Sequence, residues 1–129
     1  VVYGTTEKQS QRAIAQARLG HAQVEVNSAE ILLKSTARAV VAWGESGERC
    51  PDMERANLRL QIAHVVRQAR DVVRDVVEAS GSHAHFKSNP LQRIFRDMHT
   101  LSCHTVFDLD VGGELYGRML LGLPANAPV

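Results

Sequence analysis

The spacing of apolar residues predicts that most of this chain is helical. Between residues 53 and 79, apolar side chains return every three or four positions, which is the period of an amphipathic helix. The many β-branched valines would also suit a strand, but a strand requires a period of two, and this segment keeps the helical period throughout. We therefore predict a helix from Met53 to Ala79, with an apolar stripe formed by Leu58, Ile62, Val65, Ala69, Val72 and Val76 and widened by Val66, Val73 and Val77.

The opposite face of this predicted helix is charged. Arg67 and Asp71 are spaced so that their side chains can pair on a helix. The charged residues of this face are Arg67, Arg70, Asp71, Arg74, Asp75 and Glu78. A solvated face or a contact surface would both account for these charges. Neither reading assigns them any chemistry.

Helices are also predicted before and after this segment. Residues 10–43 contain no proline and are rich in residues that favour helices, while the Gly- and Pro-containing segment 44–52 is typical of a loop between helices. After a polar loop over residues 80–90, Asn89 and Pro90 form a typical helix start. This third helix is expected to continue through Phe107.

The glycine pair within residues 108–113 is expected to break the third helix. A short fourth helix is then expected over residues 114–121, ending at Gly122 and Pro124. The predicted fold class is all-α, an antiparallel four-helix bundle with short connections.

Length and charge narrow the classes of function. We expect residues 1–129 to form a single domain, because the chain is long enough for one core and too short for two. The 15 basic and 14 acidic residues give a formal charge of +1, and aromatic residues make up only 5%, so we expect neither a nucleic-acid partner nor a membrane partner. We find no stretch of sequence as apolar as a membrane-spanning helix, and no evident secretory signal.

The two cysteines suggest a compartment. Cys50 and Cys103 lie far apart, and two such residues without a secretory signal are usually free thiols, so we expect a cytoplasmic protein. The sequence does not begin with Met, so we also expect it to be part of a longer protein.

Sequence motifs for common active sites give no assignment. The Glu-x-x-His pairs of di-iron bundles, P-loops, Rossmann fingerprints and the Gly-x-Ser-x-Gly elbow are all missing from the sequence. His83 and His85, even with His99 or Cys103, do not supply a set of metal ligands with fixed geometry, and we expect no metal site. His104, expected on the third helix, is either a core histidine bonded to a carbonyl or a residue with a chemical role.

Residues 78–122 resemble part of a known protein family. The segment EASGSHAHFKSNPLQRIFRDMHTLSCHTVFDLDVGGELYGRMLLG resembles the C-terminal domain of the acyl-CoA dehydrogenase superfamily, in which an Arg-Asp pair follows a Pro by six and seven positions, here Arg96 and Asp97 after Pro90. Together with a His eight residues beyond Arg96, it looks most like the two-component flavin-dependent aromatic monooxygenase (hydroxylase) branch. The pair Arg96 and Asp97 could also be a structural ion pair that ties helices together.

The resemblance implies where the site residues lie. In the hydroxylases, a His at the position of His104 faces the flavin and the phenolic substrate, which implies that His104 is catalytic, as a base or as a hydrogen-bond partner of the substrate or of the C4a-hydroperoxyflavin. The loop Ser80-Gly81-Ser82 takes the place of a flavin-contacting motif, with small side chains and backbone N–H groups suited to a flavin, although a simple helix-ending turn is equally possible. A dehydrogenase would have Gln, Gly-Gly and Glu-Gly-Thr motifs and a catalytic Glu at such places, and this sequence lacks them.

The resemblance also implies cofactors and partners. It implies reduced FMN or FAD as cofactor in the intact protein, a separate flavin reductase, an aromatic small-molecule substrate and a homotetramer. Because the family's proteins carry an N-terminal helical domain and a middle β-domain, this chain is expected to be the C-terminal third and to be inactive alone. The alternatives are an acyl-CoA dehydrogenase-type oxidoreductase domain and, in isolation, an inactive oligomerisation domain.

Overall fold

Helix α2 is the centre of this molecule. The computed structural model describes residue 4 and residues 6–129; residues 1–3 and 5 of the predicted domain lie outside the described part. The long helices are α1 (Ala13–Ser46) and α2 (Asp52–Ser80), and the shorter ones are α3 (Pro90–Ser102) and α4 (Leu109–Leu120). Three short 3₁₀ turns accompany them: η1 (Gln9–Gln11), η2 (Gly81–His85) and η3 (Thr105–Phe107).

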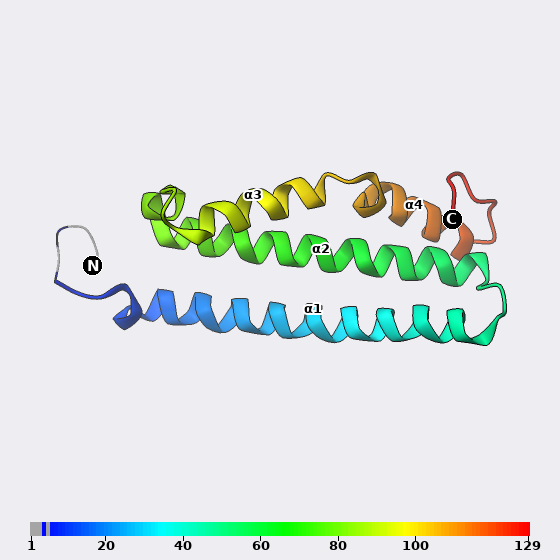
Figure 1. Cartoon of the computed structure of the whole chain (residues 1–129), viewed down its shortest axis with the longest axis horizontal. Helices are drawn as coiled ribbons and strands as arrows, with labels where there is room; N and C mark the ends of the chain where they lie inside the picture. The colour runs from blue at the N-terminus through cyan, green and yellow to red at the C-terminus, as the bar shows by residue number, and fades with distance from the viewer. Residues whose placement is uncertain (1–3, 5) are drawn as a thin grey trace.

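The helices lie nearly parallel to one long axis (Figure 1). Helix α1 runs antiparallel to α2 along one side, and α3 and α4 follow one another along the opposite side of α2. The C-terminus lies at the end of the molecule where α1 connects to α2 (Figure 1). The predicted class is confirmed: the fold is all-helical, with four helices packed together.

The predicted start of the third helix is confirmed in detail. The side chain of Asn89 accepts a hydrogen bond from the backbone N–H of Leu91 at 3.0 Å, and Pro90 occupies the first turn, where its missing N–H leaves no bond unmade. Helices α1 and α2 lie within three residues of their predicted ranges at each end. Local sequence patterns therefore determine these helices.

The boundary between the last two helices was predicted wrongly. Helix α3 ends at Ser102 rather than at Phe107, and α4 begins at Leu109, so the glycine pair lies inside a helix. Asp108 begins α4 because its carboxylate accepts hydrogen bonds from the backbone N–H groups of Asp110 and Val111 at 3.0 and 3.1 Å.

Gly112 has a packing role within α4. It is buried, and a Cβ added to it would meet the side chain of Leu60 on α2 at 3.4 Å. A glycine here allows the backbone of α4 to approach α2 closely. The residue expected to break a helix instead brings two helices together.

The core lies along both sides of α2. Leu115 of α4 is fully buried, at 0% exposure, and the stripe residues Leu58, Val65 and Val77 of α2 are buried as well. On the other side, Thr36 of α1 is 1% exposed. Its hydroxyl donates to the side-chain oxygen of Gln61 at 2.7 Å, so a hydrogen bond between buried Thr36 and half-buried Gln61 joins α1 to α2.

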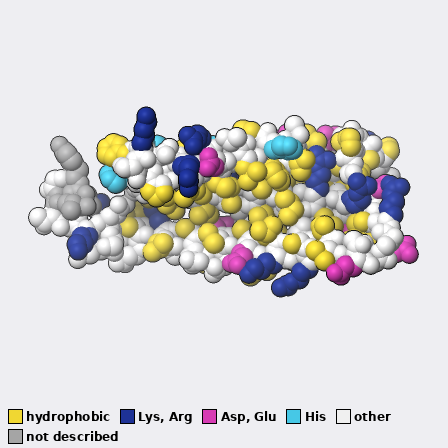
Figure 2. Space-filling view, in the orientation of Figure 1, with side chains coloured by type: hydrophobic (Ala, Val, Ile, Leu, Met, Phe, Trp, Pro, Cys, Tyr) yellow, Lys and Arg dark blue, Asp and Glu magenta, His cyan; other side chains and the backbone are white. Residues whose placement is uncertain are grey.

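Helix α1 leaves much apolar surface uncovered. Its contacts are mainly with α2, and large apolar side chains flank that contact in solvent; Ile31, for example, is 70% exposed. Figure 2 shows hydrophobic side chains gathered over the middle of the visible face, where α1 runs beside α2. Within the described residues, no helix has the length and apolarity needed to cross a membrane. The exposed apolar residues of α1 are Ile14, Leu19, Val24, Val26, Ile31, Leu33, Val40 and Val41.

Candidate functional site

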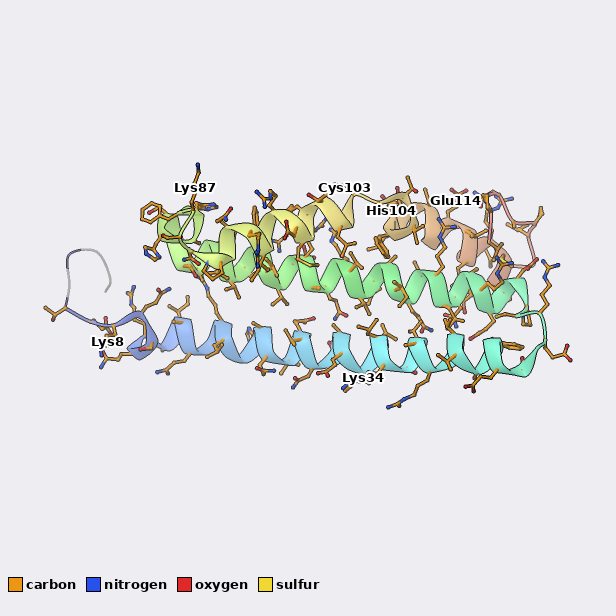
Figure 3. The ribbon with its side chains drawn as sticks, viewed as in Figure 1. Lys8, Lys34, Lys87, Cys103, His104 and Glu114 are labelled. Atoms are coloured by element: carbon orange, nitrogen blue, oxygen red, sulfur yellow. The ribbon has the colours of Figure 1, made fainter. Side chains whose placement is uncertain are left out.

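His104 lies in the connection between α3 and α4, beside Cys103 (Figure 3). The prediction that it lies within a helix was wrong, because the chain leaves α3 at Ser102 and His104 has extended backbone angles, φ −70° and ψ 134°. The residue is exposed, and its ring centroid is 5.9 Å from that of Phe107. His104 is therefore not a core histidine in this chain.

A hydrogen bond fixes the imidazole of His104. Its Nδ1 accepts from the backbone N–H of Val106 at 3.2 Å, so the side chain caps the 3₁₀ turn η3. Because Nδ1 accepts this bond, the neutral ring carries its proton on Nε2. We assign the tautomer from this hydrogen bond. In that tautomer Nε2 is a donor for a molecule that reaches the site.

A cleft of about 350 Å³ opens beside His104. Residues between Ser102 and Asp110, other than Val106, form one wall, and the middle of α2 forms the other, with Val66, Arg67 and Arg70. Asp108 and Asp110 border the cleft as well, and one carboxylate oxygen of Asp108, Oδ1, caps α4. An imidazole, two guanidinium groups and two carboxylates therefore share one cleft.

The arginines of this cleft are only partly neutralised. Arg67 pairs with Asp71 at 3.1 Å, as predicted, whereas Arg70 comes no closer than 3.6 Å to the same carboxylate and has a side chain that is 25% exposed. Arg74 also pairs with Asp71, at 3.0 Å, and the hydrogen bonds that Arg74 donates to the carboxylate of Asp75, together with the charge of Asp71, raise the pKa of Arg74. One carboxylate thus serves three arginines, and an anion in the cleft would be attracted to Arg70.

The neighbours of His104 in sequence do not form a nucleophile–base pair with it. The hydroxyl of Ser102 donates to the backbone oxygen of His99 at 2.9 Å, and Cys103 is a free, exposed thiol. Cys50 is free as well.

The second predicted region, Ser80 to Ser82, lies at the other end of α3 (Figure 1). With 13 residues in α3, the two regions are separated by about 20 Å at the usual helical rise. Gly81 has φ +67°, which favours glycine, and there is open space where a side chain would lie. Its N–H donates to Glu78 and the hydroxyl of Ser80 donates to Val76, so the exposed surface offers small side chains more than free N–H groups.

Three other histidines, in η2 and α3, have local contacts. His83 lies 3.3 Å from the side-chain nitrogen of Asn89, and the rings of His85 and His99 pack against Phe95. In the part of the chain that the structure describes, three or more His, Cys, Asp or Glu side chains do not come together as a possible metal site. Arg96 and Asp97 pair at 3.6 Å within one exposed helix and do not tie helices together.

Sequence reasoning missed the arginines of the cleft. Arg67 and Arg70 were assigned to a solvated or interfacial face, because periodicity shows which residues share a face and does not show which segment packs beside it. Asp108 carried a usable signal, since aspartate is a preferred helix N-cap, and it would have placed the start of α4 correctly.

Comparison with known proteins finds two hydroxylases of similar sequence. The chain is 35% identical over 123 residues to a pigment production hydroxylase from a Rhodococcus species, and this match covers 95% of the chain and 31% of that protein. It is 32% identical over 65 residues to the oxygenase component of p-hydroxyphenylacetate 3-hydroxylase from Acinetobacter baumannii, covering 50% of the chain and 15% of that protein.

A solved structure matches nearly the whole chain. XiaF from a Streptomyces species, determined in complex with FADH2 and glycerol, superposes with a TM-score of 0.90 at 26% identity, covering 99% of this chain and 32% of XiaF. The chain therefore spans about a third of the length of these relatives.

The family itself is established by a match over most of the sequence. The family described as "Acyl-CoA dehydrogenase, C-terminal domain" matches residues 1–109. The resemblance noted in the sequence is thereby confirmed, and the relatives named above are hydroxylases. The chain belongs to the family of acyl-CoA dehydrogenase C-terminal domains.

Proposed function

We propose that this chain is the C-terminal domain of a longer, reduced-flavin-dependent monooxygenase that hydroxylates an aromatic or phenolic substrate. The observation that carries the proposal is the placement of His104, whose Nδ1 is held by Val106 and whose Nε2 is left to donate beside a cleft that contains Arg70. The similarity to two hydroxylases supports the reaction class, and the FADH2 bound to XiaF supports the cofactor class.

In this proposal His104 acts as a hydrogen-bond donor. With Nδ1 accepting from Val106, Nε2 carries a proton and donates it in a hydrogen bond to the substrate oxygen; it does not remove a proton in this tautomer. A phenol that loses its proton to solvent would bind as a phenolate, stabilised by Nε2–H and by the charge of Arg70. Of the two roles that the resemblance implied, this geometry favours the hydrogen-bond partner over the base.

The surface of the chain fits part of a flavin. The cleft beside His104 is open and has two walls, and Ser80, Gly81 and Ser82 offer small side chains with free space at Gly81. Reduced FMN or FAD, supplied by a separate flavin reductase, would contribute the activation of dioxygen when bound. His104 and Ser80–Ser82 are about 20 Å apart. They would therefore contact either distant parts of one flavin or two different flavins in an assembly.

The decisive experiment separates the capping role of His104 from its proposed catalytic role. In the full-length protein, His104→Asn keeps an acceptor for the N–H of Val106 but lacks the donor at Nε2, so we expect an intact fold and at least a hundredfold loss of hydroxylation. His104→Gln is the matched variant, because its amide nitrogen lies near the place of Nε2, and it should retain part of the activity. Coupled hydroxylation at the wild-type rate in His104→Asn would limit His104 to capping.

The isolated chain should be inactive. Because it supplies two walls of the cleft, we expect neither tight binding of reduced flavin nor turnover of a phenol by residues 1–129 alone. Flavin fluorescence and product analysis with added reduced flavin would check this. Hydroxylation by the isolated chain would contradict the proposal that the rest of the site lies in other domains.

An acyl-CoA dehydrogenase is the rival enzyme. A Glu is missing at the position of His104 and Thr105, although the carboxylates of Asp108 and Asp110 border the cleft. The gene sequence upstream of this segment discriminates between the two enzymes. A catalytic Glu there would favour the dehydrogenase, and a neighbouring flavin reductase gene would favour the monooxygenase.

A second role is assembly. The exposed apolar flanks of α1 favour a homo-oligomer, and we propose the tetramer that the family resemblance implies. In isolation the chain would then act as an inactive oligomerisation domain. Small-angle scattering across a concentration series tests this, and a strict monomer would contradict it. A cytoplasmic location and the absence of nucleic-acid and membrane partners belong to the same proposal.

A further inference from the structure

A second depression lies at the end of the molecule where α1 turns into α2. It is a groove of about 500 Å³, and we call it the Trp43 groove. It is lined by Val40 and Trp43 of α1, Leu58 and Ile62 of α2, Val106 of η3, and Val129. The wall of this groove is apolar and includes an aromatic ring, which suits a flat apolar ligand.

Three arginines border the Trp43 groove. Arg49 and Arg55 both pair with Asp52, at 3.0 and 3.6 Å, so their charges are shared with a carboxylate. Basic side chains gather at this end of the molecule in Figure 2. The third arginine, Arg59, has a different environment.

Arg59 has no carboxylate within ion-pair distance among residue 4 and residues 6–129. Its Nη1 donates to the backbone oxygen of Pro128 at 2.8 Å, and its Nε is buried without a hydrogen-bond partner. A guanidinium held at the edge of an apolar groove without a counter-charge is unfavourable, and a carboxylate is the group that matches its planar donors.

We propose that the Trp43 groove binds a small aromatic carboxylate. The ring would pack on the apolar wall at Trp43, and the carboxylate would neutralise Arg59. This site is separate from the cleft of His104, because the two depressions have no lining residue in common. It does not depend on the reaction proposed above.

The Trp43 groove has a structural connection to His104. The side chain of Val106 lines the groove, and the backbone N–H of the same residue donates to Nδ1 of His104. A ligand that moves η3 would therefore change the hydrogen bond that orients His104. This connection makes the groove a place from which the His104 cleft can be regulated.

The experiment uses the fluorescence of Trp43, the single tryptophan of the protein. Benzoate added to the 129-residue chain should change the emission of Trp43 in a saturable way, whereas benzamide, of the same shape without the charge, should bind at least tenfold more weakly. Arg59→Met should weaken benzoate binding by about tenfold or more, because it removes the charge and keeps an apolar stem. The matched control is Arg93→Met, an exposed arginine of α3, which should bind benzoate as the wild type does.

The amide resonance of Val106 provides a second measurement. It should be among those that shift most when benzoate is added, and in Arg59→Met, once circular dichroism has shown that this variant is folded, the same shift should require about tenfold more benzoate or more. Equal binding of benzoate and benzamide, or equal binding of benzoate by both arginine variants, would overturn the proposal. A response of Trp43 to protein concentration instead of benzoate would also overturn it, because the groove would then be a contact between copies.

Discussion

The two sides of α2 are held by different kinds of contact. Toward α4, the contact is apolar and tight, with Leu115 fully buried and Gly112 allowing close approach. Toward α1, the contact, which we call the seam, adds hydrogen bonds between side chains to its apolar contacts, because Thr36 bonds to Gln61 and Gln68 bonds to Glu25 and Ser28. Apolar burial supplies most of the stability of a domain, whereas paired polar groups specify alignment. The α4 side thus stabilises the fold, and the α1 side sets the alignment of a helix whose flanks stay exposed.

The largest effect is expected on the α4 side. Leu115→Ala removes a side chain that is 0% exposed and should lower the free energy of unfolding by about 2–5 kcal/mol. Urea denaturation followed by circular dichroism measures it. Leu120→Ala, at a residue 61% exposed on the same helix, is the control and should stay within about 0.5 kcal/mol of wild type. Equal losses in the two variants would mean that the α4 side is not the tight one.

A smaller effect is expected in the buried part of the seam. Thr36→Val keeps the shape of the side chain but leaves the amide oxygen of Gln61 without its donor, which should lower the free energy of unfolding by about 1–3 kcal/mol. Thr36→Ser retains the hydroxyl and should lose less. If valine were as stable as threonine, the hydrogen bond would not contribute to holding α1 on α2.

The exposed end of the seam should contribute least to stability. Gln68→Ala breaks the bonds to Glu25 (2.9 Å) and Ser28 (3.2 Å), which are exposed to water, so the free energy of unfolding should change by no more than about 0.5 kcal/mol. The same denaturation experiment measures this. A loss above about 1 kcal/mol would show that something covers this part of the seam in solution.

The pKa of Glu30 tests whether the outer face of α1 is exposed to solvent. Glu30 accepts a hydrogen bond from Lys34 at 2.6 Å, and this bond, with the charge of Lys34, lowers the pKa of Glu30. A lowered carboxylate pKa means that the pair stabilises the fold above the ordinary pKa of Glu and that this contribution is lost as the pH falls through the lowered value. Lys34→Gln should return the pKa of Glu30 toward its ordinary range, as NMR titration would measure.

Salt gives the control for this last prediction. On a solvated face, high ionic strength should weaken the charge interaction and bring the pKa of Glu30 in the wild type closer to its ordinary value. A pKa that stays lowered in concentrated salt would place this face of α1 in an interface instead.

The sequence was sufficient to predict the long helices but not the residues that come together at the site. The apolar period of residues 53–79 predicted α2, and Asn89 with Pro90 predicted the start of α3, because both signals are local. The end of α3 was missed because apolar residues continue at helical spacing past Ser102, while a side-chain cap at His104 redirects the chain. Arg67 and Arg70 became part of the site through packing between α2 and a segment more than 30 residues away. Such tertiary proximity is not encoded in a periodic pattern.

The central position of α2 also bears on how the chain folds. Helix α1 precedes it directly and α3 follows it, so these two contacts join neighbours along the chain, whereas the contact with α4 joins residues as far apart as Leu60 and Gly112. The connections between neighbouring helices are short, and contacts between neighbours form at a small cost in loop closure. Helix α2 can therefore serve as a template on which the other helices dock in either order.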